Sequence, residues 1–273
     1  MKKKWLAAIA TLALGALVLT GCGKQKETIL TVGASSTPHA EILKHVQPQL
    51  KKEGVNLKIK TFQDYVLPNK ELASGDLDAN YFQHKPFLDN WNKKNHGTLV
   101  SAGNVHLEPI GFYSKKYKKL SDLPNGATIL VSNNVADYGR VLQILKDAGL
   151  ITLKPGTKIE SANFNDIQTN KKNLKFKTDL EPKLMTQFYK RGEGDAVVIN
   201  ANYAVQAGLN PKKDSIALEK NSSPYANLIA VQKKNKNNPA IKKLVKALQS
   251  KSTQQWINKH YNGGVVAVYP NGK

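Results

Sequence analysis

The sequence predicts an α/β fold, because patterns typical of strands alternate along the chain with patterns typical of helices. Alternation of this kind favours parallel sheets covered by helices. A second observation is an internal repeat: residues 72–83 and 188–200 each read as a helix, a glycine-acid turn, an Asp-Ala pair and a strand. Gly-Asp turns are also common loop closers, so either copy alone is weak support. The 273 residues suffice for one large or two medium domains.

The first elements follow from local patterns. Residues 28–33 form an apolar run typical of a buried strand, and Thr37-Pro38 offers an N-cap and a proline at the first helical position. The helix that follows stops at Gly54, and its apolar residues recur at helical spacing. They are Ile42, Leu43, Val46 and Leu50. The alternating residues 55–62 then predict a half-buried strand.

Two later helices are predicted by the same rules. Residues 138–148 carry an apolar face and stop at Gly149, and Asn238-Pro239 starts another helix with an apolar face. In open α/β sheets, ligands collect beyond the carboxyl ends of the strands. The residues that end the two repeated strands are therefore expected to face one cleft between the halves. These residues are Phe82, Gln83, His84 and Asn200.

The amino-terminal segment has the pattern of a bacterial lipoprotein leader. Three lysines precede the uncharged, mostly apolar residues 5–20, and the run ends in the sequence LTGC at Cys22, which matches a lipobox. Residues 1–21 are expected to be a signal peptide, Cys22 the lipidated residue and residues 22–27 a tether. Acyl chains on Cys22 would hold the protein at the outer face of the cytoplasmic membrane. A single-pass anchor is the alternative, although a span usually needs about 20 apolar residues.

Composition excludes several classes of protein. One cysteine cannot form an intramolecular disulfide, a CxxC redox pair or a Cys-based zinc site. Of the 41 basic residues, all but Arg140 and Arg191 are lysine, scattered along the chain, whereas nucleic-acid readers favour arginine. The formal net charge of +21 favours an anionic neighbour only as a nonspecific field effect. We therefore expect no nucleic-acid partner.

Motifs of catalysis are absent from the sequence. There is no GxSxG, Walker A, GxGxxG or HExxH sequence, and no nucleophile can be paired with a base. The six histidines form no HxH or HxxxH pair, which disfavours a zinc or manganese receptor with a histidine cluster. We expect no enzymatic activity, no cofactor and no metal site.

Arg140 is the most informative single residue. An arginine in the first turn of an apolar helix, in a chain that otherwise uses lysine, suggests a planar fork for a carboxylate. The alternative is a surface arginine whose stem packs on the helix, which fits Arg191 better. Asn200 follows an apolar strand pattern, and Asn227 lies in the sequence SPYANL. Paired amides can satisfy the ammonium and carboxylate of an amino acid, although each alone is more often a turn or cap residue.

An aromatic stretch surrounds Gln83. It consists of Tyr65, Tyr81, Phe82, His84 and Phe87. Such a wall suits an apolar or thioether side chain, because contacts of sulfur with ring edges contribute about 0.3–1.5 kcal/mol. Ordinary core packing is the alternative, and it is the preferred interpretation for Tyr81 and Phe87. Phe82 and His84 share one face of an extended segment, so both are expected to line the cleft if either does.

With these segments together, the chain resembles the NlpA/MetQ family of lipoproteins, the methionine-binding receptors of ABC importers. The resemblance covers essentially the whole chain after the leader. Its segments are GDLDANYFQHKP at 75–86, EPIGFYS at 108–114, Gly139-Arg140, AVVIN at 196–200 and SPYANL at 223–228. The sequence YFQH within the first segment is the most specific of them.

The resemblance implies a two-lobed periplasmic-binding-protein-like fold with a ligand cleft between the lobes. Two connecting strands would lie near residues 109–113 and 225–229. Lobe one would then comprise residues 28–110 plus 226–273, and lobe two residues 111–225.

The family's binding residues carry over by matching position. Arg140 would hold the ligand carboxylate, while Asn200 and Asn227 would bind its amino-acid backbone. Tyr65, Phe82 and His84 would enclose the thioether side chain. One segment departs from the family: residues 133–138 read NNVADY where NDPTNL is usual, which introduces Asp137 and Tyr138. This departure leaves four ligands open: L-methionine, D-methionine, methionine sulfoxide and a methionine-containing dipeptide.

The function implied is that of an extracytoplasmic, lipid-anchored receptor that binds L-methionine or a close relative. It would deliver this ligand to a membrane permease driven by a cytoplasmic ATPase. The alternatives are the same fold with a Met-containing dipeptide or another amino acid, or a cationic surface adhesin. Removal of the leader with its three lysines leaves a formal charge of 21 − 3 = +18 for such adhesion. A hydrolase that uses Asp76, Asp78 or His84 has no support in the sequence.

Overall fold

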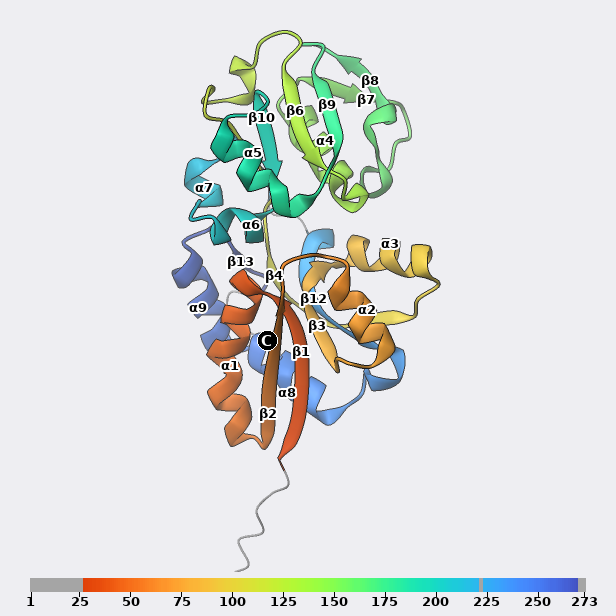
Figure 1. The fold of residues 1–273 in the computed structure, drawn as a ribbon, viewed down its shortest axis with the longest axis vertical. Coiled ribbons are helices and arrows are strands. Elements are labelled where there is room, and N and C mark those ends of the chain that lie inside the picture. The colour runs from red at the N-terminus through yellow and green to blue at the C-terminus, as the bar shows by residue number, and fades with distance from the viewer. Residues whose placement is uncertain (1–26, 221–222, 270–273) are drawn as a thin grey trace, which may run out of the picture.

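The computed structural model describes residues 27–220 and 223–269, which form two lobes stacked along the long axis of the molecule (Figure 1). The α/β class and the two-lobed arrangement predicted from the sequence are confirmed. The predicted signal peptide, the lipidation site Cys22 and nearly all of the tether lie outside the described residues. None of the helices among the described residues is both long and apolar enough to cross a membrane.

Lobe one is built on a six-stranded sheet with the strand order β13-β4-β12-β3-β1-β2. Its strands are β1 Thr28–Ser35, β2 Val55–Phe62, β3 Ala79–His84, β4 Leu99–Leu107, β12 Ala226–Gln232 and β13 Val266–Ala267. Its helices are η1 Ser36–Ala40, α1 Glu41–Lys52, α2 Leu67–Ser74, α3 Lys85–Asn95, α8 Pro239–Leu248 and α9 Lys251–Tyr261. Strand β1 is parallel to β2 and β3, whereas β12 is antiparallel to both β3 and β4. One apolar cluster joins the sheet to α1, α8 and α9, and a second joins it to α2 and α3.

Lobe two is built on a five-stranded sheet with the order β11-β5-β10-β6-β9. Its strands are β5 Gly111–Tyr113, β6 Thr128–Ser132, β9 Lys175–Leu180, β10 Ala196–Ile199 and β11 Ala217–Leu218; β7 Ile151–Leu153 and β8 Ile167–Asn170 form a separate pair. Its helices are α4 Tyr138–Asp147, α5 Met185–Arg191, α6 Ala201–Gln206 and α7 Pro211–Asp214. Its short 3-10 turns are η2 Leu120–Asp122, η3 Val135–Asp137, η4 Ile159–Ser161, η5 Phe164–Asp166 and η6 Pro182–Leu184. Two further turns lie outside this lobe: η7 Ser223–Tyr225 precedes β12, and η8 Lys233–Asn235 follows it.

The chain passes between the two sheets twice. The first crossing, residues 108–110, joins β4 to β5, and the second, residues 219–225, joins β11 to β12. Strand β5 pairs within the sheet of lobe two, and β12 pairs within the sheet of lobe one. The predicted lobe limits lie at these crossings, and they stay a prediction.

The helix starts agree with the predicted signals in one case and differ in another. Asn238 caps α8, because its side chain accepts a hydrogen bond from the Ala240 backbone N–H at 2.8 Å. Thr37 keeps an extended backbone within η1, and its hydroxyl donates to the Glu41 carboxylate at 2.7 Å. The expected side-chain cap is therefore not made at Thr37.

The two repeated segments make the same local contact in each lobe. A glycine with positive φ ends each repeat's helix: Gly75 follows α2 and Gly192 follows α5. The aspartate before each strand then forms hydrogen bonds with the backbone of the neighbouring strand. Asp78 exchanges two hydrogen bonds with the backbone of Thr31, and Asp195 does the same with Thr128. The pattern read from the sequence as a repeat is thus a repeated structural unit.

We expect Ile42→Ala to destabilise the protein by about 2–5 kcal/mol, because Ile42 of α1 is fully buried in the core of lobe one and its truncation leaves a cavity. The control is Ile29→Ala on β1, whose side chain is 54% exposed and should cost less than about 1 kcal/mol. The measurement is urea unfolding of both variants. Equal losses of unfolding free energy would contradict this account of the core.

Candidate binding site between the lobes

A small cavity lies between the lobes, and all six residues predicted to bind the ligand line it. They are Tyr65, Phe82, His84, Arg140, Asn200 and Asn227. The cavity has a volume of about 30 Å³. A larger pocket of about 480 Å³ shares Tyr65, Phe87 and Asn134 with it. These six residues are spread along the sequence, and the fold brings them to one cavity.

Aromatic rings form one wall of the cavity. The ring of Tyr65 lies 6.0 Å from that of Phe82 and 5.9 Å from that of Phe87, and the two phenylalanine rings are 5.6 Å apart. Phe87 thus belongs to the cavity wall, and the interpretation as ordinary core packing is wrong for it. That interpretation holds for Tyr81, which is fully buried in the core of lobe one. The Tyr65 hydroxyl donates to Asn202 of lobe two at 2.6 Å.

His84 ends β3 and faces lobe two. Its Nδ1 accepts a hydrogen bond from the Phe87 backbone N–H at 3.2 Å, and this contact caps α3. Because a backbone N–H can only donate, Nδ1 carries no proton. The Nε2–H is then the ring's donor, and it lies 3.0 Å from Oδ1 of Asp137. His84 thus joins the two lobes through its contact with Asp137.

Arg140 is buried rather than at the surface, with an exposed fraction of 4%. Its guanidinium donates to the Glu219 carboxylate through Nε and Nη2, to Asp137 through Nη1 at 3.0 Å and to the Glu108 carbonyl through Nη2 at 2.6 Å. The Tyr225 ring lies 4.8 Å from its central carbon. The expected carboxylate fork exists, and in this structure Glu219 occupies it.

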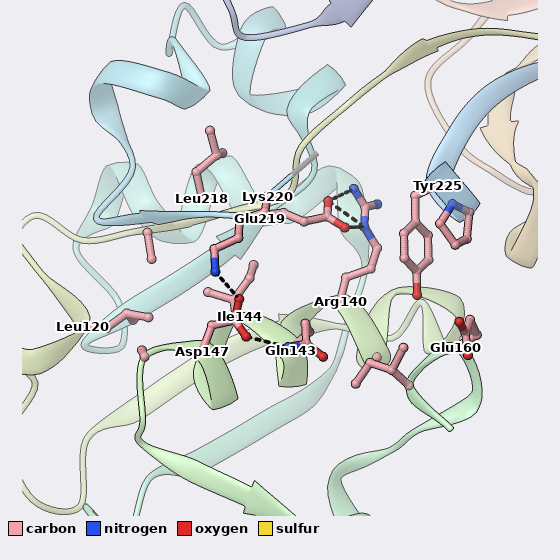
Figure 2. Close-up of a pocket in the computed structure, with 15 residues that line it drawn as sticks. Leu120, Arg140, Gln143, Ile144, Asp147, Glu160, Leu218, Glu219, Lys220 and Tyr225 are labelled. Carbon is pink, nitrogen blue, oxygen red and sulfur yellow. Dashed lines mark hydrogen bonds and ion pairs between the residues drawn. The ribbon is translucent and has the colours of Figure 1, made fainter. Parts of the chain in front are cut away.

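A glycine is required beside Arg140. A Cβ on Gly139 would lie 1.8 Å from the carbonyl oxygen of Ile159, so only glycine lets α4 begin this close to the turn η4. Beyond the guanidinium lies a second pocket of about 590 Å³ within lobe two (Figure 2). There Asp147 pairs with Lys220 at 2.9 Å.

Asp137 is the site residue that the sequence analysis did not assign. It is 1% exposed and lines the cavity. Its Oδ1 accepts from His84 and Arg140, and its Oδ2 accepts from Asn134 at 2.6 Å and Asn200 at 2.8 Å. Burial alone would raise the pKa of Asp137, but these donors and the charge of Arg140 hold that pKa well below its usual range. Asp137 is therefore an ionised carboxylate at the centre of the site.

Two other departures from the family segment, Tyr138 and Val135, lie away from this centre. Tyr138 packs against Phe164 at a ring distance of 4.9 Å and donates to the Thr178 carbonyl, inside lobe two. Val135 lines the larger pocket. The spacing of Asp137 and Arg140, three residues apart on one helical face, was the available signal that both charges meet.

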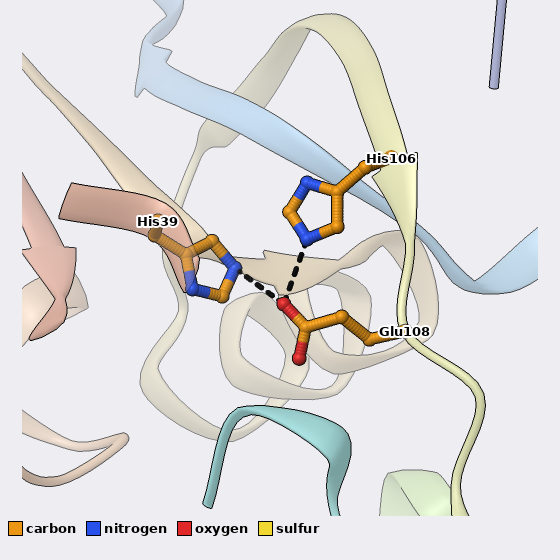
Figure 3. A group of neighbouring side chains, drawn as sticks. All are labelled: His39, His106 and Glu108. Carbon is orange, nitrogen blue, oxygen red and sulfur yellow. Dashed lines mark hydrogen bonds and ion pairs between the residues drawn. The ribbon is translucent and has the colours of Figure 1, made fainter. Parts of the chain in front are cut away.

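A buried group of two histidines and a glutamate stands behind Asn227 (Figure 3). Nε2 of His106 lies 2.7 Å from Oε1 of Glu108, and Nε2 of His39 lies 3.1 Å from the same oxygen. His39 Nε2 is also 2.9 Å from Oδ1 of Asn227, and Tyr81 bonds to the other nitrogen of His106. The sequence contains no HxH or HxxxH pair, but η1 and β4 bring His39 and His106, which are 67 positions apart, to one carboxylate oxygen.

This group offers two imidazole nitrogens and a carboxylate oxygen within 4.8 Å of one another, a donor set that zinc accepts. Here the same atoms bond to each other and to Asn227, so they form a connected hydrogen-bond network. His39 thereby binds the amide oxygen of Asn227. The amide nitrogen is then the atom of Asn227 left to contact a ligand in the cavity. Burial lowers the pKa of His39 to about 4 and that of His106 to about 3, and burial raises the pKa of Glu108.

Comparison with known proteins agrees with this architecture. The family model described as NlpA lipoprotein matches residues 30–269. The chain is 48% identical to the methionine-binding lipoprotein MetQ of Bacillus subtilis, over 98% of this chain and 99% of that one. It is 40% identical to the D-methionine-binding lipoprotein MetQ of Escherichia coli K12, over 97% and 98%.

Two solved structures are similar over most of the chain. A nutrient binding protein from Burkholderia cenocepacia bound to methionine has 46% identity and a TM-score of 0.82, covering 88% of this chain and 99% of that one. A pheromone cOB1 precursor/lipoprotein of the YaeC family from Enterococcus faecalis V583 has 59% identity and a TM-score of 0.86, covering 88% and 100%.

The buried histidines predict a pH dependence of stability. A histidine whose pKa is lowered on folding binds fewer protons in the folded state, so the free energy of unfolding rises with pH between about 4 and 6.5. Each such histidine contributes up to about 1.4 kcal/mol per pH unit in that window, and the raised pKa of Glu108 opposes this slope. His39→Gln should reduce the slope measured by urea unfolding between pH 4.5 and 6.5.

The matched control is His96→Asn, at an exposed helix end where the backbone is left-handed and asparagine is tolerated. This variant should keep the slope of the unaltered protein. Equal slopes in the unaltered protein and His39→Gln would contradict a neutral buried His39.

Proposed function

Because the chain belongs to the NlpA lipoprotein family, we propose that it is a receptor that binds methionine outside the cytoplasm and delivers it to an ABC transporter. The support from relatives is the methionine named for the B. subtilis and E. coli proteins and bound in the B. cenocepacia structure. The observation that carries the proposal is the convergence of six residues, expected from the family resemblance, on one cavity between two lobes. The role is one of binding rather than catalysis.

The cavity lining suits the two parts of a methionine molecule. The rings of Tyr65 and Phe82, with His84, would enclose the thioether, because sulfur packs favourably against ring edges. Asn200 and Asn227 would bind the amino-acid head with their amides, and Arg140 would face its carboxylate. Arg140 has one guanidinium N–H that no described residue accepts, and it belongs to Nη1.

Binding requires that the lobes part, because a cavity of about 30 Å³ is far smaller than an amino acid. The contacts that must open are hydrogen bonds, together with the packing of Tyr65 on lobe two and of Val205 on lobe one. Tyr65 meets Asn202, Tyr203 donates to the Gln63 carbonyl at 3.1 Å, and His84 meets Asp137. A hinge at the two chain crossings, with lobe limits at 110/111 and 225/226, would allow this motion.

The predicted lipid on Cys22 would keep this receptor at the outer face of the cytoplasmic membrane, near its transporter. The partners in this proposal are a permease and an ATPase. These are the components that an ABC importer adds to its binding protein.

Asn227→Ala should weaken the binding of L-methionine at least tenfold, because it removes a buried amide that His39 orients toward the site. The measurement is calorimetric titration of the purified protein, after any retained small molecule has been removed under denaturing conditions and identified by mass spectrometry. The matched control is Asn165→Ala, an exposed asparagine of lobe two, which should bind as the unaltered protein does.

We choose Asn227 rather than Arg140 for this test, because loss of Arg140 would leave Asp137 and Glu219 without their cation inside the protein. A dipeptide in place of methionine would keep the receptor role and change its ligand. If no amino acid or dipeptide bound, and attachment to anionic polymers depended steeply on salt, the adhesin alternative would replace the proposal.

Cys22→Ser should abolish covalent lipidation. The measurement is incorporation of a labelled palmitate analogue in a bacterial host with the lipoprotein pathway, read on the purified protein. The control is Gln25→Ser in the tether, which keeps the cysteine and should keep the label. Label retained on the serine variant would show that the lipid is attached elsewhere.

A further inference from the structure

We propose that Asp137 binds the ammonium group of the ligand, so that Asp137 and Arg140 together recognise a free α-amino acid by both of its charges. This inference deepens the proposed function and rests on it. It concerns a residue that stands where the family segment usually has asparagine, and it names the ligand class: an amino acid with an unmodified ammonium and carboxylate on one carbon.

The two charges are held side by side at the cavity. Oδ1 of Asp137 lies 3.0 Å from Nη1 of Arg140, and both residues line the cavity while almost wholly buried. The ammonium and carboxylate of an α-amino acid are attached to the same carbon and are likewise adjacent. In a dipeptide they are one residue further apart, about 3.8 Å between Cα atoms. The spacing of the pair therefore matches a single amino acid.

The hydrogen bonds of Arg140 determine which guanidinium N–H is left for a ligand. The Nε–H and both Nη2–H groups are directed at Glu219 and at the Glu108 carbonyl, and one Nη1–H is directed at Asp137. Of the five guanidinium N–H groups, the second one on Nη1 has no acceptor among the described residues. A ligand carboxylate on that N–H would place the ammonium of the same molecule next to Asp137.

A ligand ammonium can replace one donor of the Asp137 carboxylate, so that the number of its hydrogen bonds stays the same. Its four acceptor positions are filled by His84, Arg140, Asn134 and Asn200. An ammonium is a stronger, charge-assisted donor than the amide of Asn200, which is only half-buried at the cavity. The displaced amide is then free to contact the ligand itself.

The test compares L-methionine with 4-(methylsulfanyl)butanoate, which is methionine with hydrogen in place of the ammonium. Calorimetric titration of the unaltered protein should show at least about 30-fold weaker binding of the second compound, the loss typical of a buried charge pair that lacks one partner. In Asp137→Asn the difference should shrink to within about fivefold, because the carboxylate that reads the ammonium is gone. The control Asp179→Asn, an exposed aspartate of β9, should keep the full difference.

Each outcome decides a separate question. Equal binding of both compounds by the unaltered protein would overturn the inference without any variant. Methionine binding with the same ratio in the unaltered protein and in a folded Asp137→Asn, checked by its circular dichroism and melting temperature, would overturn it as well. Absence of methionine binding by the unaltered protein would overturn the proposed function, and the inference with it.

Discussion

The arrangement of the site depends on one buried chain of polar contacts that runs from His84 of lobe one through Asp137 and Arg140 to Glu219. Charges removed from water are tolerated only when each is paired and hydrogen-bonded, so every member of this chain fixes the place of the next. A buried ion pair is weak evidence for stability, but it requires a defined position for each of its partners. The close packing of Gly139 against Ile159 belongs to the same constraint, because it sets where the guanidinium emerges from α4.

The sequence predicted the architecture well because its signals are local. Strand and helix patterns, a capping asparagine before α8 and the repeated glycine-acid turns all act within a few residues, and the structure contains each of them. The family resemblance supplied the six site residues, which the fold brings to one cavity although Tyr65 and Asn227 are far apart in the chain. Their individual contacts with a ligand stay predictions.

What the sequence did not predict depends on tertiary contact. No spacing rule could show that His39 and His106 would share one carboxylate oxygen, since η1 and β4 meet only through the sheet of lobe one. Phe87 was assigned to core packing, but it is half-buried and lines the cavity. Asp137 stood out as an unusual residue, but its role needed the positions of its four donors, two of which lie more than fifty residues away.

The two crossings between the lobes have a consequence for how the molecule moves. Arg140 holds the backbone carbonyl of Glu108 in the first crossing and the side chain of Glu219 in the second. One guanidinium thus connects both crossings, and the same side chain lines the cavity. In the proposed receptor, a ligand that shifted Arg140 would therefore act on both crossings at once.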